Sequence, residues 1–252
     1  MFGEGKVAVV TGIGPGMGRS IALGFARHGV DVVLGARRVE RVEAVADEIR
    51  ALGRDPLVVP TDISEQQACE RIIDAAIDRF GGVDILVQNG HHEGDWKTVV
   101  DGDPDEWHRI FEINFFSAVY LIKAVVPTMT ERGGGSITLI NSGAALRVPQ
   151  TMGAYATSKT ALATLTRQAA VELGPQQIRV NGIYLGPVEG ENLVRIVQGD
   201  PEEWKKQKAL EMPLQMIPTP DQCAGAVLFM ASELAAAVTG QHLSVNGGQW
   251  TT

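Results

Sequence analysis

The stretch KVAVVTGIGPGMG, residues 6–18, decides the fold of this chain. A β-branched apolar run leads directly into a glycine-rich turn, and a helical pattern begins at Met17. The common pattern G-x-G-x-x-G fits no frame here; the spacing is T-G-x-x-x-G-x-G, with Gly12, Gly16 and Gly18. Such glycines let a pyrophosphate approach the backbone, and the helix N-terminus that follows binds anions. A glycine-rich turn also simply joins strands to helices, but its place after the first strand favours a dinucleotide site.

The rest of the chain repeats this strand–helix order. Apolar strands are predicted at 6–11, 31–36, 56–61, 83–88, 136–141, 178–184 and 241–245. Helical patterns are predicted at 17–28, 39–52, 65–80, 104–131, 155–173 and 221–232. Ser64 is the expected N-cap of the third helix. Strands that are apolar on both faces indicate a parallel sheet with helices on both sides. We therefore expect one α/β domain over residues 1–252, a doubly wound Rossmann-type sheet of seven parallel strands.

Composition excludes several classes of function. The net charge of −8 argues against a nucleic-acid partner, which usually needs a basic face. Cys69 and Cys223 have no C-x-x-C spacing, so we expect no thiolate metal site. The sequence has no run of eighteen consecutive apolar residues, so we expect no membrane span. The opening MFGEGKVAVV leads directly into a predicted strand, so we expect no signal peptide. We expect a soluble, cytoplasmic protein without a membrane partner.

One segment departs from the regular alternation. Residues 185–220 contain five prolines and a short helical piece. A long irregular segment in a compact domain is usually functional, so a substrate lid is predicted at about 187–220. Its apolar residues, such as Leu193, Trp204 and Leu214, are expected to line a pocket, although for each of them packing onto the domain is the more ordinary role.

The end of the second strand bears on the choice of cofactor. The segment reads LGARR, with no carboxylate to bind the ribose 2′-hydroxyl of NAD. Arg37 and Arg38 stand where an arginine accommodates the 2′-phosphate of NADP. Both side chains could instead be solvated at the start of the next helix. We expect NADP(H) to be preferred, with NAD(H) possible.

The segment YATSK supplies a candidate catalytic pair. Tyr155 and Lys159, four residues apart on a helix, share one face. A phenol is a poor acid–base group at neutral pH, but a nearby ammonium lowers its pKa. Such a pair is common by chance, and it gains meaning only behind a dinucleotide site.

With these motifs the sequence resembles the short-chain dehydrogenase/reductase family over the whole chain, from TGxxxGxG to VNGG. The resemblance implies hydride transfer between nicotinamide and a carbinol or carbonyl carbon, with Tyr155 as proton donor or acceptor. It implies that Lys159 binds the nicotinamide ribose and lowers the pKa of Tyr155. Ser142 in NSGAA would polarise the carbonyl, and Asn114 in FEINFF would support a water relay. The family also implies a homotetramer (or homodimer).

The resemblance assigns further cofactor contacts. Asp62, with Ile63 beside it, would contact the adenine ring. Asn89 and Gly90 belong to the loop QNGH, where the family has NNAG, so His91 replaces the last glycine. After the sixth strand, Gly186 and Val188 are expected to hold the nicotinamide end, although Leu185 and Gly190 replace the proline and threonine of the family.

The stretch QNGHHEGDW, residues 88–96, raises the question of a metal or acid–base cluster. Adjacent histidines diverge in most backbone conformations, so we predict no metal. His92 is predicted to orient substrate, or else to be a solvated loop residue. Leu146, Met152 and Trp204 are further expected pocket residues, for a hydrophobic or cyclic secondary alcohol or ketone.

Three alternatives stay open at this point. The first is an NAD-dependent alcohol dehydrogenase of the same family. The second is a non-catalytic NADP-sensing protein, which would typically lose the tyrosine or the lysine. The third is a cofactor-free lyase or dehalogenase on the same scaffold, against which the glycine loop and Lys159 argue.

Overall fold

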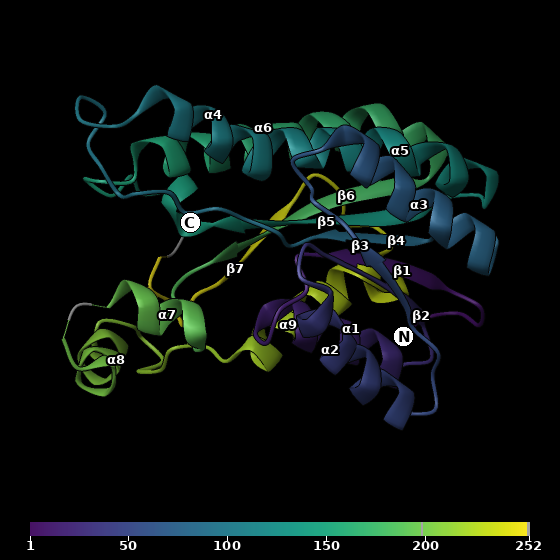
Figure 1. The fold of residues 1–252 in the computed structure, drawn as a ribbon, viewed down its shortest axis with the longest axis horizontal. Helices are drawn as coiled ribbons and strands as arrows, with labels where there is room; N and C mark the ends of the chain where they lie inside the picture. The colour runs from purple at the N-terminus through teal and green to yellow at the C-terminus, as the bar shows by residue number, and fades with distance from the viewer. Residues whose placement is uncertain (198, 251–252) are drawn as a thin grey trace.

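A computed structural model of the chain describes residues 1–197 and 199–250, so residue 198 of the predicted lid and the last two residues lie outside the described part. Seven strands form one parallel sheet in the order β3-β2-β1-β4-β5-β6-β7 (Figure 1). Their bounds are β1 Val7–Thr11, β2 Asp31–Ala36, β3 Leu57–Pro60, β4 Ile85–Gln88, β5 Gly135–Ser142, β6 Ile178–Leu185 and β7 His242–Val245. The predicted doubly wound sheet is confirmed.

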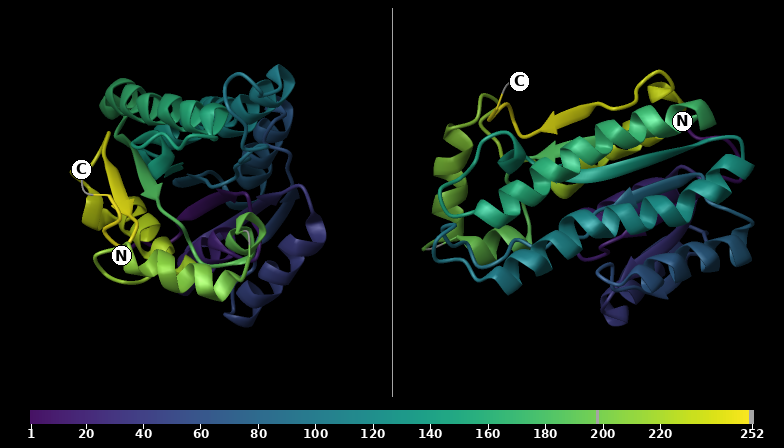
Figure 2. Two further views of the ribbon diagram at one scale, coloured as in Figure 1. Left: turned by 90° about the vertical axis from the view of Figure 1, so that its left-hand side faces the viewer. Right: turned by 90° about the horizontal axis from the view of Figure 1, so that it is seen from above.

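Helices cover both faces of the sheet (Figures 1 and 2). One face carries α1 (Met17–Arg27), α2 (Val39–Ala51) and α9 (Pro220–Ala231). The other carries α3 (Gln66–Phe80), α4 (Pro104–Phe111), α5 (Ser117–Glu131) and α6 (Gly153–Leu173). The two short helices α7 (Glu191–Ile196) and α8 (Pro201–Leu210) stand apart from both layers, beyond the carboxyl ends of the strands.

Two apolar cores explain why the strands read as unbroken hydrophobic runs. Every residue of β1 is buried, with alternate side chains on opposite faces. Ala8 and Val10 join the core under α1, α2 and α9. Val7 and Val9 join the core under α3, α5 and α6. Such two-sided burial is typical of a parallel sheet between helical layers.

The strand order reverses between β1 and β4. The chain runs from β1 outward to β3, then returns to place β4 on the other side of β1. The connections on the two sides diverge there and leave a crevice at the carboxyl ends of the strands, which is where open α/β sheets bind ligands.

The long helix predicted at 104–131 is not regular. A π-helical turn, η1 (Glu112–Phe116), separates α4 from α5. Such turns are frequent at functional sites.

By length and composition, the run Pro104–Glu131 is apolar enough to cross a membrane, although it contains no eighteen consecutive apolar residues. The finding is weak evidence, because a core helix passes the same test. Leu121, Val125 and Met129 of this run are fully buried in the core on the sheet.

The predicted N-cap of the third helix is also wrong. Glu65 occupies the cap position, and its side chain makes no capping bond. Ser64 instead donates its N–H and its hydroxyl to Asp62, at 3.1 and 2.7 Å. These bonds fix the turn that follows β3 and hold the Asp62 carboxylate in place.

Candidate active site

One cleft of about 890 Å³ opens at the carboxyl ends of the strands. It is lined by most of the site residues that the sequence predicts: Gly12, Gly16, Met17, Gly18, Arg37, Arg38, Asp62, Ile63, Asn89, Gly90, Ser142, Met152, Tyr155, Lys159, Gly186, Val188 and Trp204. Three predicted site residues, Asn114, His92 and Leu146, do not line it.

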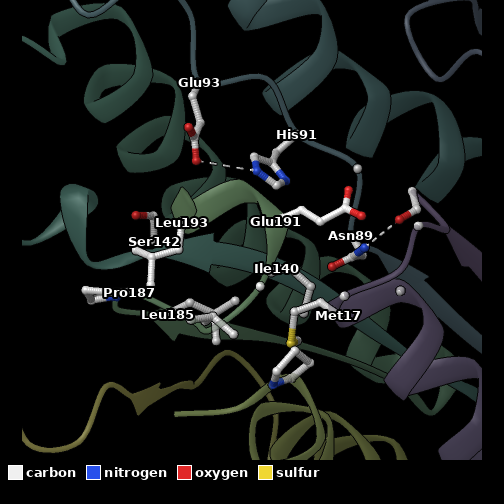
Figure 3. A pocket seen from close by; sticks show the side chains of 18 of the residues that line it. Met17, Asn89, His91, Glu93, Ile140, Ser142, Leu185, Pro187, Glu191 and Leu193 are labelled. Atoms are coloured by element: carbon white, nitrogen blue, oxygen red, sulfur yellow. Dashed lines mark hydrogen bonds and ion pairs between the residues drawn. The ribbon is translucent and has the colours of Figure 1, made fainter. Parts of the chain in front are cut away.

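The glycine loop forms one end of the cleft. Gly12 has φ of 72°, and a Cβ there would overlap the backbone of Gly90. The Asn89 amide donates to the Gly12 carbonyl at 2.8 Å, which joins the β1 and β4 loops (Figure 3). A Cβ on Gly18 would lie 2.6 Å from the Gly12 carbonyl oxygen, so α1 packs directly against the turn.

This end of the cleft fits the pyrophosphate of a dinucleotide. Gly14 and Gly16 face open space, where a Cβ would meet no other atom within 4 Å. The first N–H groups of α1 have no acceptor within the helix, and its macrodipole favours an anion at this end. The loop therefore offers room, donors and positive potential at one point.

The adenosine end carries arginines and no carboxylate at the tip of β2. Arg37 and Arg38 are both exposed, and neither side chain makes an ion pair or hydrogen bond with any described residue. Arg41, on the first turn of α2, lies 3.9 Å from Glu191 of α7. This contact links the helix after β2 to the lid across the mouth of the cleft.

Ser142, Tyr155 and Lys159 line one wall of the cleft. Ser142 ends β5, while Tyr155 and Lys159 stand one turn apart on α6. Asn141 fixes the two elements to each other, because its amide donates to the Lys159 carbonyl at 3.0 Å. The ammonium of Lys159 donates to the Ile140 carbonyl at 2.9 Å and lies 5.8 Å from the centre of the Tyr155 ring.

Burial dominates the ionisation of this pair. It lowers the pKa of Lys159 to about 7, since an ammonium loses its hydration there. It also raises the pKa of the Tyr155 phenol, and a hydrogen bond with Ser142 acts in the opposite direction. The negative charge of Glu93 raises the pKa of both groups. The lowering of the Tyr155 pKa by Lys159, which the family resemblance implies, stays a prediction.

Asn114 lies in the π turn and is fully buried. Its side-chain oxygen accepts the His92 N–H at 2.8 Å. Its amide donates to the His92 carbonyl at 2.9 Å and to the Ser158 hydroxyl at 3.1 Å. The side chain thus fastens the loop after β4 to α6, and a water relay at this position would be left to its main chain.

The two histidines of QNGHHEGDW point to different places. His91 lines the cleft, and its Nε2 lies 3.7 Å from Oε1 of Glu93 (Figure 3). His92 turns away from the cleft and bonds Glu106 of α4 at 2.6 Å. The prediction that His92 orients substrate is therefore wrong, because Asn114 and Glu106 hold it outside the cleft. No three His, Cys, Asp or Glu side chains converge as a metal site within residues 1–197 and 199–250.

The cleft has a second part, here called the substrate end, which is lined by Glu93, Trp96, Met152, Trp204 and Trp250. Trp250 was missed by the sequence reasoning. Its ring packs so closely on Gly143 that any Cβ at that position would overlap it. No local sequence signal predicts this contact, because Gly143 and Trp250 are far apart in the sequence.

Two other expectations for this part of the chain differ from the structure. Leu146 is 38% exposed and points away from the cleft, because the 3-10 turn Gly143–Ala145 redirects the chain after β5. In the lid, Leu193 and Trp204 line the cleft, but Leu214 is exposed. Leu193 also packs with Met212 and Ile217 in a small core of the lid itself.

One departure from the family pattern after β6, Gly190, has a physical reason. Gly190 caps α7 with φ of 135° and ψ of −173°, a conformation that threonine would adopt only under strain. The main-chain N–H and carbonyl of Val188 make no hydrogen bond with a described residue, and Val188 lines the cleft. These free groups fit the carboxamide of a nicotinamide.

Comparisons with known proteins agree with this site. Residues 12–249 match the family model described as enoyl-(acyl carrier protein) reductase. The chain is 37% identical to the 7α-hydroxysteroid dehydrogenase of Escherichia coli (strain K12), covering 97% of this chain and 94% of that one.

Two solved structures share the fold over nearly the whole chain. A 7α-hydroxysteroid dehydrogenase complexed with NADH and 7-oxo glycochenodeoxycholic acid is 36% identical, with a TM-score of 0.91 and 98% of each chain covered. The L-sorbose reductase of Gluconobacter frateurii, complexed with NADPH and L-sorbose, is 31% identical, with a TM-score of 0.93, covering 100% of this chain and 99% of that one. This chain belongs to the short-chain dehydrogenase/reductase family of NAD(P)-dependent oxidoreductases that act on hydroxyl and carbonyl groups.

Proposed function

We propose that this protein is an NADP(H)-preferring oxidoreductase that interconverts a cyclic, largely hydrophobic secondary alcohol and its ketone. The observation that carries the proposal is the single cleft that joins a glycine cradle, two unpaired arginines and the Ser142–Tyr155–Lys159 wall. The bound nicotinamide supplies or accepts the hydride.

The residues of the wall have separate roles. Tyr155 gives a proton to the carbonyl oxygen in reduction and takes it back in alcohol oxidation. Ser142 hydrogen-bonds the same oxygen and holds the carbonyl against the phenol. Lys159 binds the nicotinamide ribose, and in its charged form it favours the phenolate. Asn114 is a positioning residue, which acts through the loop at His92 and through Ser158.

The cofactor preference follows from charge. Arg37 and Arg38 are free of acidic partners in the described chain, and an acidic residue at the tip of β2 is absent from the sequence LGARR. Two charge-assisted hydrogen bonds to a 2′-phosphate would favour NADPH over NADH by about 2 kcal/mol, or roughly thirtyfold.

The reaction is tested with a panel of cyclic ketones and NADPH or NADH, following the absorbance of the reduced nicotinamide. We expect turnover with NADPH, and a loss on the order of a hundredfold or more in kcat for Tyr155→Phe with cofactor affinity retained. Tight NADPH binding without turnover of any ketone would support a sensor instead. Full activity in Tyr155→Phe would disprove the assigned proton transfer.

The preference has its own test. The double variant Arg37→Ala/Arg38→Ala should raise the Kd of NADPH about thirtyfold and leave that of NADH within about twofold. Arg50→Ala is the matched control, since Arg50 lies on α2, is bonded to Asp47 at 2.7 Å and is outside the cleft. Equal losses for both cofactors would favour the NAD-dependent alternative. A cytoplasmic location and a homotetramer are part of the same proposal.

A further inference from the structure

The loop after β4 presents to the cleft a carboxylate, Glu93, that has no hydrogen bond from the described protein. The side chain of Glu93 is 30% exposed and accepts no hydrogen bond from any described residue. Among the described residues, its ion-pair contact is with Nε2 of His91, at 3.7 Å. A carboxylate has about four acceptor positions, and partial burial costs free energy unless donors replace the water lost from them. A carboxylate that is partly covered inside a cleft therefore favours a ligand that donates a hydrogen bond to it.

The position of Glu93 is fixed from both sides. Asn114 holds both backbone groups of His92, the preceding residue, and Glu106 holds the His92 ring. Gly94, the following residue, has φ of 79° and packs on Ile110. With its neighbours held in this way, Glu93 is a preorganised group and not a mobile surface carboxylate.

Glu93 faces the reacting atoms, not the cofactor phosphates. In Figure 3 it lies above Ser142, on the opposite side of the cleft from Met17 and the glycine loop. Its charge acts on Tyr155 and Lys159 alike, which places it close to the catalytic wall.

The rest of the substrate end defines the kind of molecule that Glu93 meets. Trp96, Trp204 and Trp250 give flat apolar walls that suit a ring. The cleft is also lined by the cations Arg147 and Lys208 and by the carboxylates Glu189 and Glu191, and Lys208 is paired with Glu211 at 2.5 Å. A ring with one hydrogen-bond donor beside its reacting carbon matches these walls and the Glu93 carboxylate.

We infer that Glu93 is a specificity-determining residue whose carboxylate accepts a hydrogen bond from a hydroxyl group carried next to the reacting carbon. The substrate class is therefore a vicinal hydroxy alcohol or hydroxy ketone on a ring. A carboxylate at that position on the substrate is rejected by charge repulsion. This inference rests on the proposed oxidoreductase function.

The test compares three alcohols that differ at one ring position: cyclohexanol, trans-1,2-cyclohexanediol and 2-hydroxycyclohexanecarboxylate. Each is oxidised with NADP⁺ at saturation; the hydride of the carbinol carbon passes to the nicotinamide and the hydroxyl proton to Tyr155. We expect kcat/KM to be at least about tenfold higher for the diol than for cyclohexanol, and lowest for the hydroxy acid.

Glu93→Ala should reduce the preference for the diol over cyclohexanol at least about tenfold, mainly by raising KM for the diol, because the bond is made in both ground and transition states. Glu93→Gln keeps the shape and removes the charge, so it should raise the activity on the hydroxy acid relative to cyclohexanol at least threefold or so. Asp95→Asn is the matched control, since Asp95 is in the same loop, pairs with Lys97 and does not line the cleft. It should leave both ratios unchanged.

The outcomes separate this inference from the proposed function. A wild-type protein that oxidises cyclohexanol, with ratios that stay the same in both Glu93 variants, overturns the role of Glu93 alone. A wild-type protein that binds NADP⁺ but oxidises none of the three alcohols overturns the proposed cyclic substrate and this inference with it. If Glu93→Ala fails to fold, as judged by its melting temperature, the ratios in Glu93→Gln decide.

Discussion

Replacing Asn114 with alanine tests whether its side chain holds the loop after β4 or serves proton transfer directly. The substitution removes a fully buried amide with three hydrogen bonds and leaves the His92 N–H, the His92 carbonyl and the Ser158 hydroxyl without that partner. Because His92 is only half-buried, water can replace part of the lost bonding. The free-energy cost is therefore smaller than for three fully buried groups left without a hydrogen bond. About 1 kcal/mol for each lost bond gives a destabilisation of about 3 kcal/mol.

This free energy predicts a measurable change in melting temperature. For a chain of 252 residues the entropy of unfolding is on the order of 0.5 kcal/mol per degree, so the melting temperature should fall by about 6 °C. The loop that carries His91 and Glu93 should also loosen, which raises KM for substrate more than it lowers kcat. Thermal unfolding followed by circular dichroism, with steady-state kinetics on the same samples, measures both effects.

Ser158→Ala is the graded control for this prediction. It removes one of the three partners of Asn114, together with the bond from the Ser158 hydroxyl to the Tyr155 carbonyl at 2.7 Å, and leaves both bonds to His92 in place. Two lost bonds predict about 2 kcal/mol and about 4 °C. An Asn114→Ala protein with an unchanged melting temperature and KM but a much lower kcat would refute the reasoning, because the side chain would then act on the proton transfer and not on the loop.

Two further predictions concern the buried lysine and the C-terminal indole. Burial lowers the pKa of Lys159 to about 7. Between that pH and the ordinary lysine pKa, the unfolded chain therefore binds one more proton than the folded chain. The free energy of unfolding should rise with pH across this window. Urea unfolding at pH 7, 8 and 9 should show a rise in the wild type that exceeds the rise in Lys159→Met; parallel profiles would show that the lysine stays charged. Trp250→Ala should widen the substrate end beside Gly143, raising KM for cyclohexanol several-fold while the Kd of NADPH changes little. A selective loss of NADPH affinity would instead place the indole at the cofactor.

The sequence was most informative where structure is set locally. Three features follow from neighbouring residues alone: the strand before Gly12, the spacing of Gly16 and Gly18, and the helical register of Tyr155 and Lys159. All three lie where the sequence predicts them. The ends of strands are also the points where a parallel sheet places its ligands, which is why most of the predicted cofactor residues line one cleft.

What sequence reasoning missed depends on contacts between distant segments. Asn114, more than twenty residues later, holds the backbone of His92, and Asn114 itself lies in a π turn that the sequence analysis did not predict. Trp250 reaches Gly143 only because β7 runs beside β6 and returns the chain to the cleft.

The pairing of β1 has a consequence for how the protein folds. Val7 pairs with Asp31, but Ala8 pairs with Ile85, so the second neighbour of the central strand arrives much later along the chain. The glycine turn is completed by the same event, because Gly90 and Asn89 close on Gly12 only when β4 is in place. Long loops must be closed before such contacts stabilise the chain, so we expect this docking to belong to a late stage of folding. Nicotinamide dinucleotide can therefore recognise only chains that have passed that stage, and by mass action it stabilises them against reopening.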